Sequence, residues 1–331
     1  MPKLLDFNGL CDFIREHKAD KCLITFHSIG DRDAVGSAIP LSRYFEDATI
    51  ATPDYITNNA RYMIERVGYG NKIDSKFRED AKLIIVLDTN TLESVGSFKE
   101  KIKGSSAQML FIDHHLLVES EERAIMFNDE GFNSTASIVY DVLKKLGQHI
   151  DKESSILLLN GIISDSAEFK NASSETFMQI SELLENAKTT YAEIMEYFHN
   201  PITLDNRYYL IHDLYASTVE ITGKYLVVYG QANSHANIAA DMAIQTGADF
   251  SIFWAVNEKE ASISARLRPP LDTKLHIHLG KILHEAASYI NGNGGGHPCA
   301  AGAYGPNRDM VNEAVGYALK QVRQIFSEAR K

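Results

Sequence analysis

Residues 22–37 read CLITFHSIGDRDAVGS, and this stretch decides the fold of the first half of the chain. Its first five residues form an apolar run of strand length, and a turn of small and polar residues then leads into helical periodicity from about Val35. The apolar runs LIIVL at 83–87 and MLFI at 109–112 repeat the pattern. Short apolar runs that alternate with amphipathic segments are typical of parallel strands joined by crossover helices. The first half is therefore predicted to be an α/β domain with a doubly wound, mainly parallel sheet.

The second half repeats this alternation on a smaller scale, after a mainly helical stretch from about residue 134 to 215. Helix-start signals stand at Ser134 and Ser173. Strands are then predicted at 218–222, 225–229, 250–254 and 261–266, and helices at 236–246, 274–290 and 308–328. The predicted domains are residues 1–190, a helical linker at 191–216, and a smaller mixed α/β domain at 217–331, with the active site in the cleft between the domains.

Composition excludes several classes of protein. A chain of 331 residues has the length of about two domains. It is 44% apolar with a net charge of −11, which excludes a disordered or fibrous protein and a broadly basic nucleic-acid-binding face. Its three cysteines are too few and too scattered for a disulfide framework or a CxxC zinc site. We expect a cytoplasmic protein without a membrane span, because no signal peptide or run of about 18 apolar residues occurs.

Charged and imidazole side chains follow three of the apolar runs in the first half. They are His27, Asp31 and Asp33 after the first, Asp88 after the second, and Asp113, His114 and His115 after the third. A further carboxylate, Asp165, follows an apolar helical run. Ligands of open α/β sheets bind beyond the carboxyl ends of the strands, so we expect these side chains to meet there.

Carboxylate and imidazole groups without a thiolate suit Mn²⁺, and Mg²⁺ less well, rather than structural zinc. Taken alone, each motif has an ordinary explanation, because an Asp at a strand end often caps a helix and an Asp-x-Asp is common in surface turns. Together they favour a metal site, since several acids in one crevice would repel one another without cations.

The four motifs, in this order, resemble those of the DHH phosphoesterase superfamily, which takes its name from the triplet at 113–115. The resemblance implies two Mn²⁺ ions bridged by Asp88. The first ion would be bound by His27, Asp31 and Asp88, and the second by Asp33, Asp88, His114 and Asp165. His115 is then expected to face the substrate phosphate, while Asp113 orients an imidazole from behind the ligands.

A glycine-rich run, GNGGGHPCAAGA at 292–303, is the second signal. Glycines let the backbone approach an anion closely, although a flexible loop would have the same composition. The run looks like the GGGH motif of the DHHA1 domain, and Ser264-Ala265-Arg266 resembles its Ser-x-Arg strand. The resemblance implies that Arg266 clamps phosphate and that Gly294, Gly295, Gly296 and His297 hold the nucleotide.

Three other features have competing explanations. Arg32 could contact substrate or point to solvent. The pair His276 and His278 invites a metal interpretation, but packing at the start of a helix is favoured. The run Arg207-Tyr208-Tyr209 could stack bases or, as we favour, pack between domains.

The resemblance implies a manganese-dependent phosphoesterase that hydrolyses short RNA or DNA oligonucleotides or nucleotide phosphates, by activation of water between two metal ions. A RecJ-like single-strand exonuclease is the enzymatic alternative. A non-catalytic nucleotide sensor or replication scaffold is the alternative of another class. A homodimer is left open.

Overall fold

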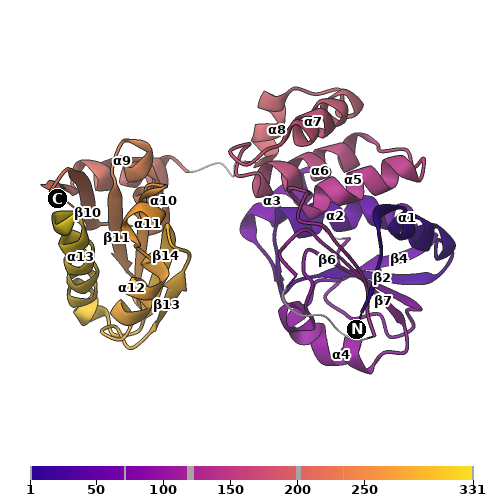
Figure 1. The fold of residues 1–331 in the computed structure, drawn as a ribbon, viewed down its shortest axis with the longest axis horizontal. Coiled ribbons are helices and arrows are strands. Elements are labelled where there is room, and N and C mark those ends of the chain that lie inside the picture. The colour runs from indigo at the N-terminus through magenta and orange to yellow at the C-terminus, as the bar shows by residue number, and fades with distance from the viewer. Residues whose placement is uncertain (1, 71, 118–122, 199–202, 234, 330–331) are drawn as a thin grey trace. The chain divides into compact units, whose positions relative to one another are not determined.

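The computed structural model describes residues 2–70, 72–117, 123–198, 203–233 and 235–329. The chain forms two compact units, Met1–Asn200 and Pro201–Lys331, which are described separately (Figure 1).

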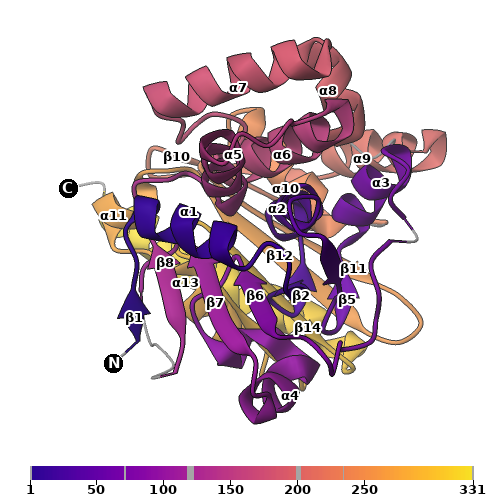
Figure 2. The same cartoon turned by 90° about the vertical axis from the view of Figure 1, so that its right-hand side faces the viewer.

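The first unit is built on a six-stranded sheet in the order β1-β8-β7-β6-β2-β4, and every neighbouring pair is parallel. Figure 2 shows β8, β7, β6 and β2 side by side. The strands are β1 (Lys3–Leu4), β2 (Lys21–Phe26), β4 (Asp47–Ile50), β6 (Leu83–Leu87), β7 (Gln108–Asp113) and β8 (Ile125–Asn128). The strands β3 (Ile29–Gly30) and β5 (Tyr55–Ile56) form a separate parallel pair.

Helices cover both faces of this sheet. Side chains alternate along each strand, so one strand contributes to the core on each face. In β6, Ile85 and Leu87 belong to one core cluster, whereas Ile84 and Val86 belong to another. The first cluster contains residues of α1 (Phe7–Glu16), α2 (Arg32–Ser42), α3 (Asn58–Arg66), α5 (Thr135–Lys145), α6 (Lys152–Asp165), α7 (Ser174–Ala187) and α8 (Tyr191–Phe198). The second contains residues of η1 (Leu92–Phe98) and α4 (Lys99–Gly104). The predicted doubly wound parallel sheet is confirmed.

The second unit has a mixed sheet in the order β13-β14-β12-β11-β10-β9, in which only β10 and β11 pair in parallel. Its strands are β9 (Thr218–Thr222), β10 (Tyr225–Gln231), β11 (Phe250–Val256), β12 (Ala261–Leu267), β13 (Asn293–Gly296) and β14 (Ala300–Gly305). Two core clusters lie on its two faces. One includes α12 (Leu279–Ala286) and α13 (Val311–Glu328), and the other includes α9 (Leu204–Tyr215) and α10 (Ala236–Gln245).

The predicted helix at 274–290 is wrong in its extent. The chain instead forms α11 (Leu271–Leu275) and α12, and a left-handed His276 separates them. His278 accepts from the backbone N–H of Lys281 as the N-cap of α12, so it stands at the start of a helix, as we favoured. A short 3₁₀ turn, η2 (Arg308–Met310), precedes α13.

Within the described ranges, the helices are all too short or too polar to cross a membrane.

Candidate metal centre

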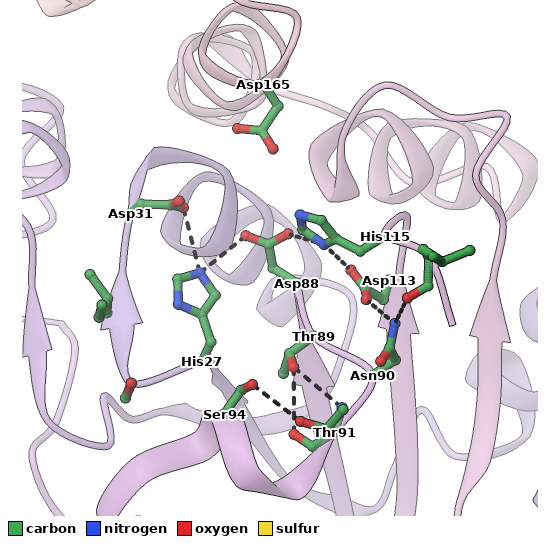
Figure 3. A pocket seen from close by; sticks show the side chains of 13 residues that line it. His27, Asp31, Asp88, Thr89, Asn90, Thr91, Ser94, Asp113, His115 and Asp165 are labelled. Atoms are coloured by element: carbon green, nitrogen blue, oxygen red, sulfur yellow. Dashed lines mark hydrogen bonds and ion pairs between the residues drawn. The ribbon is translucent and has the colours of Figure 1, made fainter. Parts of the chain in front are cut away.

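Three neighbouring strands deliver the central residues of the site. β2, β6 and β7 are adjacent and parallel, so their carboxyl ends lie at the same edge of the sheet. His27 follows β2, Asp88 follows β6, and Asp113 is the last residue of β7. Figure 3 shows these side chains converging on one pocket of about 500 Å³. The expected meeting of distant polar groups thus takes place at this edge.

Two helices add carboxylates to the same pocket. Asp31 is the N-cap of α2, where its Oδ1 accepts from the backbone N–H groups of Asp33 and Ala34 at 3.0 and 3.1 Å. Asp165 is the last residue of α6 and lines the pocket from the opposite side (Figure 3). With Oδ1 held by the helix terminus, Asp31 has Oδ2 available for a ligand.

Asp88 lies at the centre of the cluster, and its two carboxylate oxygens face different groups. Oδ2 lies 3.2 Å from His27 Nε2, whereas Oδ1 accepts from Thr135 Oγ1 at 3.1 Å and lies 3.6 Å from His114 Nε2. The backbone of Asp88 has φ of 61°, a left-handed conformation that costs free energy for most residues and that Asp tolerates better than most. Such local strain is common at functional sites.

The Nε2 atom of His114 lacks a hydrogen-bond partner among the residues that the structure describes, although it lies among carboxylates. This buried atom faces three of them, at 3.3 Å from Asp165 Oδ2, 3.6 Å from Asp88 Oδ1 and 3.9 Å from Asp33 Oδ2. A buried polar nitrogen without a partner is costly unless something between it and the acids pairs with it.

Asp33 is fully buried and accepts two backbone hydrogen bonds from the first turn of α5. Its Oδ2 accepts from Thr135 N at 2.6 Å and its Oδ1 from Ala136 N at 2.8 Å. Gly161 leaves room for this carboxylate, because a Cβ there would lie 2.8 Å from Asp33 Oδ1. Asp33 therefore lies beside the cluster and also caps α5.

His115 is held from behind by Asp113. Asp113 Oδ1 accepts from the backbone N–H of His114 and lies 2.8 Å from His115 Nδ1, while Oδ2 accepts from Asn90 Nδ2 at 2.8 Å. With Nδ1 engaged, only Nε2 of His115 remains to meet a ligand in the pocket.

Charge balance without a metal requires protonated imidazoles. Burial lowers the pKa of His27, but Asp31 and Asp88 outweigh this effect and raise it to about 10. The pKa of His114 is likewise lowered by burial and raised by Asp165 and Asp88, to about 11. Burial raises the pKa of Asp88, but the neighbouring imidazoles of His114 and His27 outweigh it, so the pKa lies below its usual value. Burial, then Asp88 and Asp165, raise the pKa of Asp33.

These groups fit divalent cations. Two sets of donor atoms each lie within 4.8 Å of one another, His27, Asp31 and Asp88 in one set and Asp88, His114, His115 and Asp165 in the other. Because Asp88 belongs to both sets and presents Oδ2 to His27 and Oδ1 to His114, it is placed to bridge two ions. Cations would also bind the unpaired Nε2 of His114 and would neutralise the negative charge of the buried carboxylates. The donor set of oxygen and imidazole nitrogen suits Mn²⁺ or Mg²⁺.

Several residues of the site escaped the sequence analysis. Asn90 and Thr135 hold Asp113 and Asp88 through side-chain hydrogen bonds, and Asn128 donates to the backbone carbonyl of His115 at 2.7 Å. A signal existed for Gly161, because a glycine inside an apolar helix often marks a close approach. Single polar residues after a strand carry no comparable signal.

The predicted substrate residues lie in the second unit, away from the metal cluster in sequence. Ser264 and Arg266 lie on one face of β12. Arg266 uses one edge of its guanidinium on Asp241 of α10, with Nε at 2.6 Å from Oδ1 and Nη2 at 3.3 Å from Oδ2. Arg266 is therefore held in a fixed orientation by a carboxylate of its own chain.

The glycine run forms the edge strand β13 and not a loop. Gly294 packs so closely against α12 that a Cβ would lie 2.2 Å from the Leu283 carbonyl oxygen, whereas a Cβ on Gly295 would meet nothing within 4 Å. Gly295 pairs with Gly302, which pairs with Ser264, so these three residues form a row without large side chains on the face that carries Arg266. His297 is exposed just beyond β13.

The glycine strand, with Lys281 and His284 of α12, also lines a second pocket of about 400 Å³. Arg32 does not point to solvent, because this side chain is buried, stacks on the Phe198 ring with Cζ 4.1 Å from the ring centroid, and donates to the Phe198 carbonyl.

The chain matches the models of two known domain families. Residues 21–162 match the model of the DHH family N-terminal domain, and residues 222–328 match the DHHA1 domain. The bifunctional oligoribonuclease and PAP phosphatase NrnA of Bacillus subtilis is 22% identical over 296 residues, which are 86% of this chain and 89% of that protein.

Solved structures show the same fold. An exopolyphosphatase-related protein from Bacteroides fragilis superposes with a TM-score of 0.74 at 20% identity, over 96% of this chain and 97% of that one. The exonuclease RecJ bound to manganese gives a TM-score of 0.55 at 12% identity, over 97% of this chain and 95% of that one. With both domains present in order and an acid and histidine cluster in the first of them, this chain belongs to the DHH phosphoesterase superfamily.

Proposed function

We propose that this protein is a manganese-dependent phosphoesterase that hydrolyses short oligonucleotides or nucleotide phosphates. The observation that carries the proposal is the buried Nε2 of His114, which faces Asp88 and Asp165 without a hydrogen-bond partner among the described residues. Such an arrangement calls for a cation, and the name of a structural neighbour, RecJ bound to manganese, supports the choice of ion.

The metal ligands would form two sets that share Asp88. His27, Asp31 and Asp88 would hold one cation, and Asp88, His114 and Asp165 the other, with Asp33 beside it. When bound, paired divalent cations supply an activated water and neutralise charge on the phosphoryl oxygens. Since the chain carries a net charge of −11, this local positive charge is also what an anionic substrate requires.

His115 would donate a hydrogen bond to the substrate phosphate. Its Nδ1 is hydrogen-bonded to Asp113, which leaves Nε2 to point at a ligand. The hydrogen bond with Asp113 raises the pKa of His115 and so favours the charged imidazolium. A charge-assisted hydrogen bond from this nitrogen would strengthen as negative charge develops on the phosphoryl group.

The second unit would bind the nucleotide. Arg266 offers a planar guanidinium that suits phosphate, and Gly295 lies in a row without large side chains, where a ligand can approach the backbone. The proposed substrates follow one relative that aligns over 86% of this chain, NrnA, which is named an oligoribonuclease and PAP phosphatase.

A substrate panel tests the proposal. A dinucleotide, a short RNA, a short DNA, a long single strand, 3′-phosphoadenosine 5′-phosphate and pyrophosphate would be incubated with Mn²⁺, with Mg²⁺ or with EDTA. We expect Mn²⁺-dependent release of mononucleotides or phosphate from the short substrates. Cleavage of the long strand alone would favour the exonuclease alternative, and no turnover with either metal would favour the non-catalytic one.

A further inference from the structure

One side of the pocket at the metal centre is lined by hydroxyl groups instead of metal ligands, and we call this side the hydroxyl wall. Its residues are Ser28 in the loop after β2, Thr91 at the start of η1 and Ser94 within η1. Figure 3 shows Thr91 and Ser94 on the side of the pocket away from Asp165. At about 500 Å³ the pocket lies within the range of about 300–1,000 Å³ that holds whole small molecules, so it has room for more than a phosphate.

Backbone hydrogen bonds hold the hydroxyl wall together. The N–H of Ser28 donates to the carbonyl of Ser94 at 2.7 Å, which joins the loop after β2 to η1. The carbonyl of Ser28 in turn accepts from the N–H of Tyr55 at 3.3 Å. The two segments approach closely at Gly96, because a Cβ there would lie 2.9 Å from the Cβ of Ser28. The wall is therefore a preformed surface of the first unit.

The side chains of the wall keep hydrogen-bonding capacity for a ligand. Thr91 is the N-cap of η1, yet its hydroxyl makes no capping hydrogen bond. It lies 3.1 Å from the hydroxyl of Ser94, and such a contact uses only one of the two hydroxyl protons. The hydroxyl of Ser28 has no partner among the residues that the structure describes. The wall can thus both donate to and accept from a ligand, as a sugar hydroxyl requires.

The charge of the pocket suits a single phosphate. Among the described residues its lining contains four carboxylates and neither lysine nor arginine. Two divalent cations would balance the carboxylates, and His115 would then balance the charge of one phosphodiester. A second phosphate against the hydroxyl wall would meet no cation in this lining, and an unpaired charge is costly to remove from water. An uncharged group fits the wall better.

Apolar side chains complete the lining of the pocket. Ile29 of β3 and Leu116 after β7 both belong to it. The sugar and base of a nucleoside have apolar surfaces that gain from such contacts, whereas an inorganic polyphosphate has none. Charge for one phosphate, hydroxyl groups and apolar surface are together what a nucleotide needs.

We propose that the hydroxyl wall binds the ribose next to the phosphate that is cleaved, and that Thr91 and Ser94 make the pocket prefer ribonucleotides to deoxyribonucleotides. Their hydroxyls would hydrogen-bond the 2′-hydroxyl, the group that a deoxyribonucleotide lacks. A site that hydrogen-bonds a substrate hydroxyl rejects the analogue without it, because the polar groups of the site then lose a partner. This inference rests on the proposed phosphoesterase function and names RNA as its substrate class.

Nucleotide binding to the full chain tests the proposal without turnover. Calorimetry in Mn²⁺ would compare adenosine 5′-monophosphate and adenosine 3′-monophosphate with their 2′-deoxy counterparts. For the phosphate position that the pocket accepts, we expect the ribonucleotide to bind about 3- to 10-fold more tightly, the range of one hydrogen bond. Equal affinities of the ribo- and deoxyribonucleotides, or no binding of any of the four, would overturn the proposal.

Removal of single hydroxyls locates the discrimination. Ser94→Ala and Thr91→Val should each weaken ribonucleotide binding about 3- to 10-fold, while the affinities for the deoxyribonucleotide and for Mn²⁺ stay unchanged. Ser97→Ala, at a serine of η1 that does not line the pocket, is the matched control and should keep the preference. Circular dichroism would check the fold of each variant. Equal weakening of both nucleotides would mean that the wall contacts the phosphate, and the sugar assignment would be wrong.

Turnover separates this inference from the proposed function. A ribodinucleotide and its deoxy counterpart would be assayed beside the binding measurements. If neither is hydrolysed while the ribonucleotide preference in binding holds, the proposed phosphoesterase function fails and the hydroxyl wall is still supported as a sugar site. If both are hydrolysed with the same KM and bind equally, the phosphoesterase function stands and the assignment of the hydroxyl wall is rejected.

Discussion

The metal centre of the first unit and the glycine strand of the second differ in whether their polar groups already have partners within the chain. Around Asp88, buried acids face a nitrogen without a partner, so the protein alone leaves a demand for positive charge. Around β13, Arg266 already has Asp241 as a partner, and Gly294 is explained by packing against α12. A buried polar atom without a hydrogen-bond partner therefore points to a ligand more directly than a conspicuous sequence motif does.

Asp88→Asn tests the metal centre and should have the largest effect. Asn tolerates the left-handed backbone as Asp does, but it cannot bridge two cations. Loss of a residue that only supports a metal ligand lowers turnover about 10- to 100-fold, and the loss in this variant should be larger. Steady-state assays and manganese titration by calorimetry measure this, with the exposed Asp12→Asn as control. Normal manganese-dependent activity would refute the ligand assignment.

Asn90→Leu tests whether the support behind His115 matters. The substitution leaves Asp113 Oδ2 without its donor, so we expect turnover to fall about 10- to 100-fold while manganese still binds. Stability should fall by about 1–3 kcal/mol, because a buried acceptor loses its partner. Turnover and chemical unfolding would be measured together, and loss of manganese binding in this variant would show that Asn90 supports the ligands rather than His115.

Arg266→Lys tests the face of the second unit. Lysine keeps the charge but loses the planar fork, so KM for a nucleotide substrate should rise about tenfold. Arg268→Lys, at a neighbouring arginine that pairs with Asp249, is the matched control and should leave KM unchanged. Equal effects of the two variants would remove the special role of Arg266.

A pair of glycine variants separates packing from binding in β13. Gly294→Ala places a methyl group 2.2 Å from the Leu283 carbonyl oxygen and should destabilise the protein by about 1–3 kcal/mol. Gly295→Ala meets open space, so stability should hold while KM rises. Thermal unfolding and KM of both variants give the answer, and an unchanged KM in Gly295→Ala would remove this position from the binding surface.

The metal-free protein should lose stability as the pH rises above 6.5. His27 and His114 have folded pKa values of about 10 and about 11, above the unfolded value of about 6.5. Their protonated forms therefore stabilise the fold fully below pH 6.5, and this contribution declines as the pH rises toward the folded values. Unfolding temperatures in EDTA should fall between pH 6.5 and 8.5, and the gain from added Mn²⁺ should grow. A gain independent of pH would contradict this charge balance.

Much of the fold could be predicted because hydrophobic periodicity is local. The runs at 83–87 and 218–222 became strands with those bounds, and Ser134 and Ser173 cap helices as expected. The predicted helix at 274–290 was wrong because His276 adopts a left-handed conformation and divides it. The glycine strand β13 was not among the predicted strands, since it forms only by pairing with β14 and packing on α12.

Local strand and helix signals were enough to predict which chemical groups are present and that each acid or imidazole of the cluster stands at the end of a strand or helix. Only the tertiary structure decided that Asp88 presents one oxygen to His27 and the other to His114, that Asn90 and Thr135 support the site, and that Arg32 packs on Phe198. Those contacts join residues far apart in the chain. Their geometry depends on the order of strands in the sheet, which no local pattern encodes.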